Sequence, residues 1–146
     1  MLVAGLLLVP AVDLGVKVAL ERRLGARALS LGPLGSVHVM SSQPWIVRLG
    51  ADRADPRTFA LALGALWCCA AVALVAASVW LPAMSSFAGL LLGGSLSHAV
   101  ETAWRGRVTD YVRLRFWPAC NLADVAITVG GFGVLAQAWR AMPPVW

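Results

Sequence analysis

The feature that most constrains the fold of this chain is an uncharged apolar run at residues 58–81. Its sequence is TFALALGALWCCAAVALVAASVWL. The hydrocarbon core of a bilayer is about 30 Å thick and requires about 20 helical residues, so this run is long enough to cross it. Of the 146 residues, 60% are hydrophobic and only 13% are charged, whereas soluble domains carry roughly 25% charged residues. The sequence therefore predicts an integral membrane protein, with residues 1–146 forming a single domain.

Three further apolar segments are candidates for membrane spans. They cover about residues 1–20, 83–100 and 122–141. The first has no basic start and carries Asp13 and Lys17 in its core, which argues against a cleavable signal peptide. We therefore expect an all-α membrane protein, a four-transmembrane-helix bundle. Its two longer loops, residues 21–57 and 101–121, would lie on one side of the membrane.

The first loop contains two short runs of alternating polarity, residues 36–40 (SVHVM) and 44–49 (PWIVRL). Such runs could pair as small strands lying on the membrane surface. The only histidine in this loop, His38, is expected to be structural. The predicted fold is thus a helical bundle with a small strand-containing loop region.

The basic residues are concentrated in the two loops. Seven of the 12 lie between Lys17 and Arg57, and four between Arg105 and Arg115. Read alone, the positive-inside rule places these loops in the cytoplasm. The net charge is +5; because the arginines flank apolar spans and no nucleic-acid motif is present, lipid headgroups are the expected counterions.

Two acids, Asp110 and Asp124, are predicted near the same membrane face. Two carboxylates in a partly dry site share one proton, with one pKa raised. An aspartic peptidase uses that state: the ionised acid takes a proton from water, and the protonated acid polarises the scissile carbonyl. The alternative is structural. Asn121 and Asp124 have the spacing of a helix capping box, and Asp110 could be a solvated loop acid.

Other charged residues in or beside the spans also require partners. Asp13 and Lys17 are four residues apart, so they share a helix face and can neutralise each other in the bundle interior. His98 and Glu101 are three residues apart and could bind a metal, but two ligands are too few for a typical site, so we predict a hydrogen-bonded pair and no metal. The three cysteines contain no CxxC spacing and predict no zinc or redox centre.

These motifs together resemble the lipoprotein signal peptidase family, also called signal peptidase II. The family has a Gly-Gly-rich third helix, a Gly-x-Val-x-Asp-Phe stretch, an Asn-x-Ala-Asp start to helix four and Asp-x-x-x-Lys in helix one. The chain matches these features in order, with Gly93-Gly94, GRVTDY at 106–111, NLAD at 121–124 and Asp13-x-x-x-Lys17. The resemblance implies a catalytic pair, Asp110 and Asp124. The supporting or substrate-binding residues would be Asn121, Asp13, Lys17, His98 and Glu101.

The chain departs from the family pattern at two places. The family's Gly-Asn-x-x-Asp-Arg run is replaced by SHAVET, residues 97–102, so that His98 stands for the asparagine and Thr102 for the arginine. Arg105 or Arg107 would have to substitute for that arginine. The family's Asn-x-Gly-Ala-Ala-Phe signature is absent from the first loop, where Ser42 or Gln43 are the nearest polar candidates.

The resemblance implies a membrane aspartic endopeptidase that cleaves signal peptides from prolipoproteins before a lipid-modified cysteine. It implies no cofactor, and as partners prolipoprotein signal peptides and membrane lipid but no nucleic acid. It also implies the bacterial cytoplasmic (inner) membrane, with the active site toward the extracytoplasmic face, opposite to the arginine count. Two alternatives stay open. The chain could be a catalytically impaired relative that binds signal helices or lipoproteins, or a small transporter with a proton path through Asp13, Lys17 and Glu101.

Overall fold

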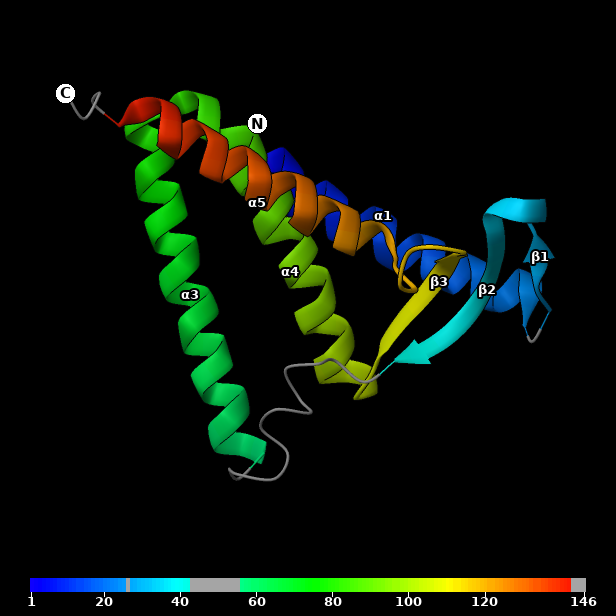
Figure 1. Ribbon diagram of the computed structural model, residues 1–146. Helices are drawn as coiled ribbons and strands as arrows, with labels where there is room; N and C mark the ends of the chain where they lie inside the picture. The colour runs from blue at the N-terminus through cyan, green and yellow to red at the C-terminus, as the bar shows by residue number, and fades with distance from the viewer. Residues whose placement is uncertain (26, 43–55, 143–146) are drawn as a thin grey trace.

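A computed structural model describes residues 1–25, 27–42 and 56–142 of the protein. It consists of helices, a small sheet and two 3-10 turns (Figure 1). In chain order the elements are α1 (Leu2–Leu24), β1 (Leu29–Ser30), η1 (Gly32–Leu34), β2 (Gly35–Ser42), α3 (Pro56–Trp80), η2 (Pro82–Met84), α4 (Ser85–Arg105), β3 (Val108–Leu114) and α5 (Leu122–Ala141).

The four predicted apolar segments all form helices, but they are not equal as membrane spans. The segment at 122–141 coincides with α5, whereas α1 continues to Leu24 and α4 to Arg105. Three helical stretches of the described chain are long and apolar enough to cross a bilayer: Leu2–Leu24, Pro82–Arg105 and Leu122–Ala141. In α3 the stretch that qualifies as apolar helix is the shorter Gly64–Trp80. The membrane character is therefore confirmed, and within the described residues three of the four predicted spans have full length.

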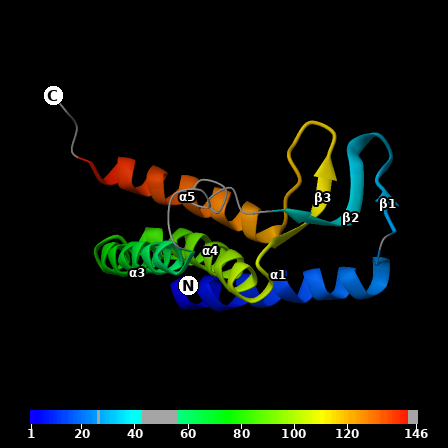
Figure 2. The same ribbon diagram turned by 90° about the horizontal axis from the view of Figure 1, so that it is seen from below.

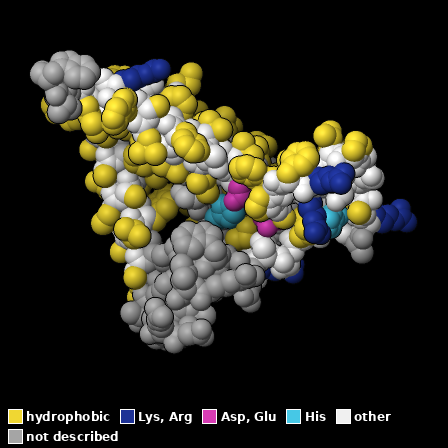
Figure 3. Space-filling view, in the orientation of Figure 1, with side chains coloured by type: hydrophobic (Ala, Val, Ile, Leu, Met, Phe, Trp, Pro, Cys, Tyr) yellow, Lys and Arg dark blue, Asp and Glu magenta, His cyan; other side chains and the backbone are white. Residues whose placement is uncertain are grey.

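The polar and apolar side chains are distributed as expected for a protein in lipid. Apolar side chains cover the helices on the face shown in Figure 3, and exposed examples include Leu7, Val72 and Leu135. Several of the most deeply buried side chains are instead polar or charged. They are Asp13, Lys17, Ser97, Glu101, Thr109 and Asn121. Since lipid solvates apolar groups and not charges, the charged residues gather inside the bundle.

Glycines allow α4 to pack closely against both α1 and α5. A Cβ added to Gly93 would lie 2.4 Å from the carbonyl oxygen of Gly5, and one added to Gly130 would lie 2.5 Å from the amide nitrogen of Leu91. Backbones approach this closely only where side chains are absent, which is a common way for helices to associate in lipid. A Cβ added to the adjacent Gly131 would meet no described atom within 4 Å, so this glycine does not take part in the close approach.

The three strands form one antiparallel sheet with the order β1-β2-β3. The predicted strand at residues 36–40 lies within β2, but its described partners are β1 and β3. The second predicted run, residues 44–49, lies outside the described residues. The pairing of β2 with β3 sets Met40 opposite Asp110, with an irregularity between Val37 and Met40. The sheet therefore brings the two loops together and places β3, the strand that carries Asp110, beside the helices (Figure 2).

The N-terminal end of α1 and the C-terminal end of α5 both point away from the sheet (Figure 1). Helix α3 diverges from α4 toward its own N-terminal end, as the same view shows. One polar contact between these helices is a hydrogen bond from Trp67 Nε1 to Ser95 Oγ, 2.8 Å long. The closely packed unit that positions the site is thus formed by α1, α4, α5 and the sheet.

Adjacent glycines in α5 offer a matched test of this packing. We expect Gly130→Ala to destabilise the protein by about 1–3 kcal/mol, the usual range for overpacking, because its Cβ would collide with the α4 backbone. Gly131→Ala should be neutral or stabilise by about 0.4–1 kcal/mol, because alanine restricts the unfolded chain. Thermal unfolding in detergent measures both variants, and equal effects would contradict the α4–α5 contact.

Candidate functional site

The centre of the bundle is a buried ion cluster around Lys17. Its ammonium Nζ lies 2.7 Å from Asp13 Oδ2 and 2.7 Å from Glu101 Oε2. The side chains of Lys17 and Asp13 are fully buried, and that of Glu101 is 1% exposed. The predicted Asp13–Lys17 pair is present in the structure, and Glu101 joins it from α4. Buried charges in such an environment require partners, and each of these three has at least one.

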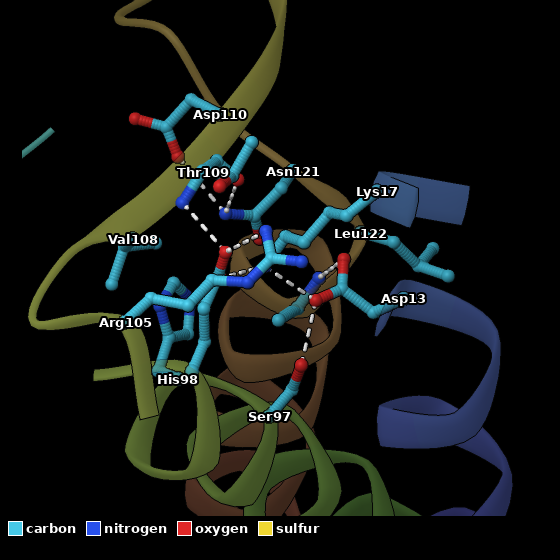
Figure 4. Close-up of polar contacts among 12 residues, drawn as sticks. Asp13, Lys17, Ser97, His98, Arg105, Val108, Thr109, Asp110, Asn121 and Leu122 are labelled. Carbon is cyan, nitrogen blue, oxygen red and sulfur yellow. Dashed lines mark hydrogen bonds and ion pairs between the residues drawn. The ribbon is translucent and has the colours of Figure 1, made fainter. Parts of the chain in front are cut away.

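The same cluster ties four elements together through its carboxylates. Asp13 accepts hydrogen bonds from Ser97 Oγ at 2.6 Å and from the backbone N–H of Ala123 at 3.3 Å. Glu101 Oε1 accepts the backbone N–H of Thr109 at 3.2 Å. These contacts join α1 to α4, to β3 and to the first turn of α5 (Figure 4). The cluster therefore determines where Asp110, next to Thr109, and Asp124, next to Ala123, are held.

His98 and Glu101 have separate partners in the structure, in contrast to the hydrogen-bonded pair expected from sequence. His98 Nε2 lies 3.1 Å from Asp124 Oδ1, whereas Glu101 turns to Lys17. Both residues lie on one face of α4, but Glu101 pairs with Lys17 on α1 and His98 pairs with Asp124 on α5. Among the described residues no group of three or more potential ligands could hold a metal.

Arg105 is better placed than Arg107 to replace the arginine absent at position 102. Its guanidinium forms an ion pair with Glu21 and lies 3.8 Å from Glu101 Oε1, while Arg107 is exposed. Arg105 therefore adds positive charge beside Glu101. Its contacts are with the ion cluster and the end of α1.

Asn121 links the two aspartates. It is the N-cap of α5, and its side-chain oxygen accepts the backbone N–H of Asp124 at 3.0 Å. In return Asp124 Oδ2 accepts the backbone N–H of Asn121 at 2.8 Å, which confirms the predicted capping box. The amide nitrogen of the same side chain donates to Asp110 Oδ1 at 2.9 Å. One buried residue thus bonds to both carboxylates.

Asp110 lies on β3 and has a second donor on β2. Ser42 Oγ donates to Asp110 Oδ2 at 2.7 Å, so the sheet pairing brings together residues from both loops. The Asp110 residue is 8% exposed. Burial raises its pKa above 3.8, opposed by the Ser42 hydrogen bond and reinforced by the charge of Asp124. The two carboxylates are therefore close enough to interact electrostatically.

Two polar residues of this region were not identified from sequence. Thr109 offers its carbonyl to Asn121 Nδ2 at 3.2 Å in addition to its bond with Glu101. The hydroxyl of Tyr111 accepts the backbone N–H of Leu122 at 2.9 Å, and burial raises the pKa of this phenol to about 12. The alternating, β-branched stretch VTDYV was a signal for a strand that would have placed both residues.

Removing the central cation tests the role of the ion cluster. We expect Lys17→Met to destabilise the protein by about 3–5 kcal/mol, because two buried carboxylates lose their shared partner. Arg140→Met is the control; Arg140 is exposed near the far end of α5, and its loss should change stability by less than about 0.5 kcal/mol. Chemical or thermal unfolding in detergent compares the two, and a tolerant Lys17→Met would contradict the cluster's structural role.

The burial of Asp110 predicts a pH-dependent cost to stability. Its raised pKa means that the folded protein holds this proton more tightly than the unfolded chain. The stability that this bound proton contributes is fully present below about pH 3.8, the ordinary pKa of an aspartate. It is lost as the pH rises through the pKa of Asp110 in the folded protein. Asp110→Asn should therefore melt above wild type at pH 7, because asparagine cannot ionise. The advantage should vanish near pH 4, and a variant that melts lower than wild type at pH 7 would refute this expectation.

Comparison with known proteins relates this geometry to characterised chains. Two solved structures described as bacterial membrane enzymes, determined by the in meso method at 1.9 and 2.3 Å resolution, share the fold. Their TM-scores are 0.75 and 0.72, each at 16% sequence identity, and the alignments cover 97% and 95% of this chain and 94% and 87% of theirs. At this identity the similarity establishes the fold alone.

The curated relatives are lipoprotein signal peptidases. That of Moorella thermoacetica is 42% identical over 55 residues, 38% of this chain and 35% of the relative. That of Methylorubrum extorquens is 35% identical over 89 residues, 53% of this chain and 52% of the relative. The chain thus aligns with about a third to a half of the relatives' length. The family model described as "Signal peptidase (SPase) II" matches residues 6–140, so the chain belongs to the signal peptidase II family.

Proposed function

We propose that the protein is a membrane aspartic endopeptidase that cleaves signal peptides from prolipoproteins immediately before a lipid-modified cysteine. The observation that carries the proposal is the double contact of Asn121 with Asp110 and Asp124. A capping box requires only Asp124 and Asn121. The additional bond to a buried acid on another element is what a two-carboxylate site requires.

The proposed reaction needs only these two side chains and water. The ionised aspartate takes a proton from water, whose oxygen attacks the peptide carbonyl carbon, while the protonated aspartate gives its proton to the carbonyl oxygen. When the C–N bond breaks, the leaving amine takes the first proton, and the second returns from the hydroxyl to its aspartate. Each carboxyl group ends in its starting state. The raised pKa of Asp110 fits the member that carries the proton at the start.

The remaining residues of the site act as supports in this proposal. Asp13, Lys17 and Glu101 hold the backbone on either side of the aspartates through Ala123 and Thr109. Asn121 orients both carboxylates, and His98 contacts Asp124. The substrate's apolar signal helix would lie against the lipid-facing sides of the spans, and the sheet would cover the peptide near the cleavage point.

We place the protein in the bacterial cytoplasmic membrane as one domain, with α3 counted as the fourth span. The sheet and both aspartates would face the extracytoplasmic side. In support, the N-terminal end of α1 and the C-terminal end of α5 both point away from the sheet (Figure 1), as four crossings require. This orientation opposes the positive-inside rule. Arginines such as Arg113 and Arg115 lie exposed on or beside β3, where they can contact anionic headgroups instead of marking a cytoplasmic loop.

A catalytically impaired binding protein is the second candidate function. It is favoured by the departures at His98 and Thr102, and by the structural partners of both Asp124 oxygens. Such a protein would retain affinity for prolipoproteins without turnover. It would need no second acid on β3, which is why we rank it below the peptidase.

Cleavage of a diacylglyceryl-modified prolipoprotein by the purified protein tests the proposal. We expect Asp110→Asn and Asp124→Asn each to lower the rate at least 10²-fold, the lower end of general acid–base contributions. Glu21→Gln removes an acid that pairs with Arg105 away from the aspartates and should stay within a few-fold of wild type. Binding without cleavage by the wild-type protein would favour the second candidate. Full activity in both aspartate variants would exclude the assigned pair.

A further inference from the structure

The surroundings of the two aspartates differ in charge. Asp124 faces the imidazole of His98 and lies at the third residue of α5, where backbone N–H groups favour an anion. The hydrogen-bond donors described at Asp110 are the neutral groups of Asn121 and Ser42. Asp110 is also the more buried of the two, since Asp110 is buried whereas Asp124 is only partly buried. The environment thus favours a negative charge on Asp124 over one on Asp110.

The contact between His98 and Asp124 is better described as an ion pair than as a hydrogen bond. The distance from Nε2 to Oδ1 is 3.1 Å, yet Nε2 is buried with no hydrogen-bond partner of adequate geometry in the described part of the chain. An attraction between opposite charges depends on distance more than on direction. A charged imidazole therefore accounts for both the short distance to Asp124 and the lack of hydrogen-bond geometry. The family pattern has asparagine at this position, which cannot carry a charge.

We propose, building on the peptidase function above, that His98 is a positioning residue whose imidazolium holds Asp124 in the ionised form, so that the proton of the pair lies on Asp110. Asp124 is then the base that takes a proton from water, and Asp110 is the acid that gives one to the carbonyl oxygen. His98 touches neither substrate nor water in this role. It fixes which carboxyl group performs which half of the reaction.

Other charged groups around His98 do not replace this contact. Asp110 on β3 and Asp124 on α5 both interact with the imidazole charge, and both acids also act electrostatically on Cys120. Lys17 on α1 acts on Asp124 at longer range and is itself paired with Asp13 and Glu101. On α4 itself, Glu101 and Arg105 contact the ion cluster and Glu21. The α3 sequence from 64 to 80 contains no acidic or basic residue.

The pH dependence of cleavage by His98→Asn tests the proposal. Asparagine retains a hydrogen-bond donor and removes the cation, so Asp124 accepts a proton more readily. The acid limb of the profile should move to higher pH by about one to three units, the usual effect of one nearby charge. His38→Asn is the matched control, because His38 lies on β2 against Ser36, and its limb should not move. A uniform loss of rate in His98→Asn with an unmoved limb would show a purely structural role and overturn the proposal.

A second measurement does not depend on cleavage. Thermal unfolding of His98→Asn, Asp124→Asn and the double variant forms a double-mutant cycle. We expect the stability effects of the two substitutions to be non-additive at about pH 6, because each substitution removes one partner of the same contact. Absence of coupling at pH 6 would overturn the ion pair. If wild type fails to cleave prolipoproteins but the coupling is present, the peptidase function fails while the pairing of His98 with Asp124 stands.

Discussion

The structure depends on keeping one ammonium group and its acidic partners buried in a helical bundle whose outer surface is apolar. Lys17 cannot leave the interior cheaply, because charges at mid-membrane cost several kcal/mol each. Asp13 and Glu101 satisfy it from two helices, and their remaining oxygens bind backbone N–H groups of α5 and β3. The need to neutralise charge thus becomes a geometric constraint on the two segments that carry the aspartates. The side chains of the ion cluster can meet only if the helices lie close together, and the glycine contacts allow that close approach.

The aspartate site illustrates how a structural motif and a chemical one can use the same atoms. The capping box satisfies orphan N–H groups at the start of α5 and would be stabilising in any helix. Here its asparagine has a free amide nitrogen, which binds the acid on β3. Helix initiation and carboxylate alignment therefore share one residue. The burial that raises the pKa of Asp110 costs stability once that carboxyl group is ionised.

Sequence reasoning succeeded where the determinants are local. The bounds of α5 follow from its capping box and apolar content, and the Asp13–Lys17 pair follows from helical spacing. Strand β3 was not predicted, although VTDYV favours a strand, because its pairing partner β2 lies some 70 residues earlier in the chain. The contacts of His98 with Asp124 and of Ser42 with Asp110 are likewise long-range. Spacing along one helix had suggested instead that His98 and Glu101 pair with each other.

The dispersal of the site along the chain has a consequence for biogenesis. Ser42 and Asp110 are 68 positions apart, and Asp110 meets Asp124 only through a residue that starts the last helix of the described chain. A nascent chain that has inserted only α1, α3 and α4 into the bilayer has not yet placed Asn121, the residue that bonds to both acids. Insertion of α5 therefore brings the acid pair together. Partly inserted chains would carry the separate acids without their shared geometry.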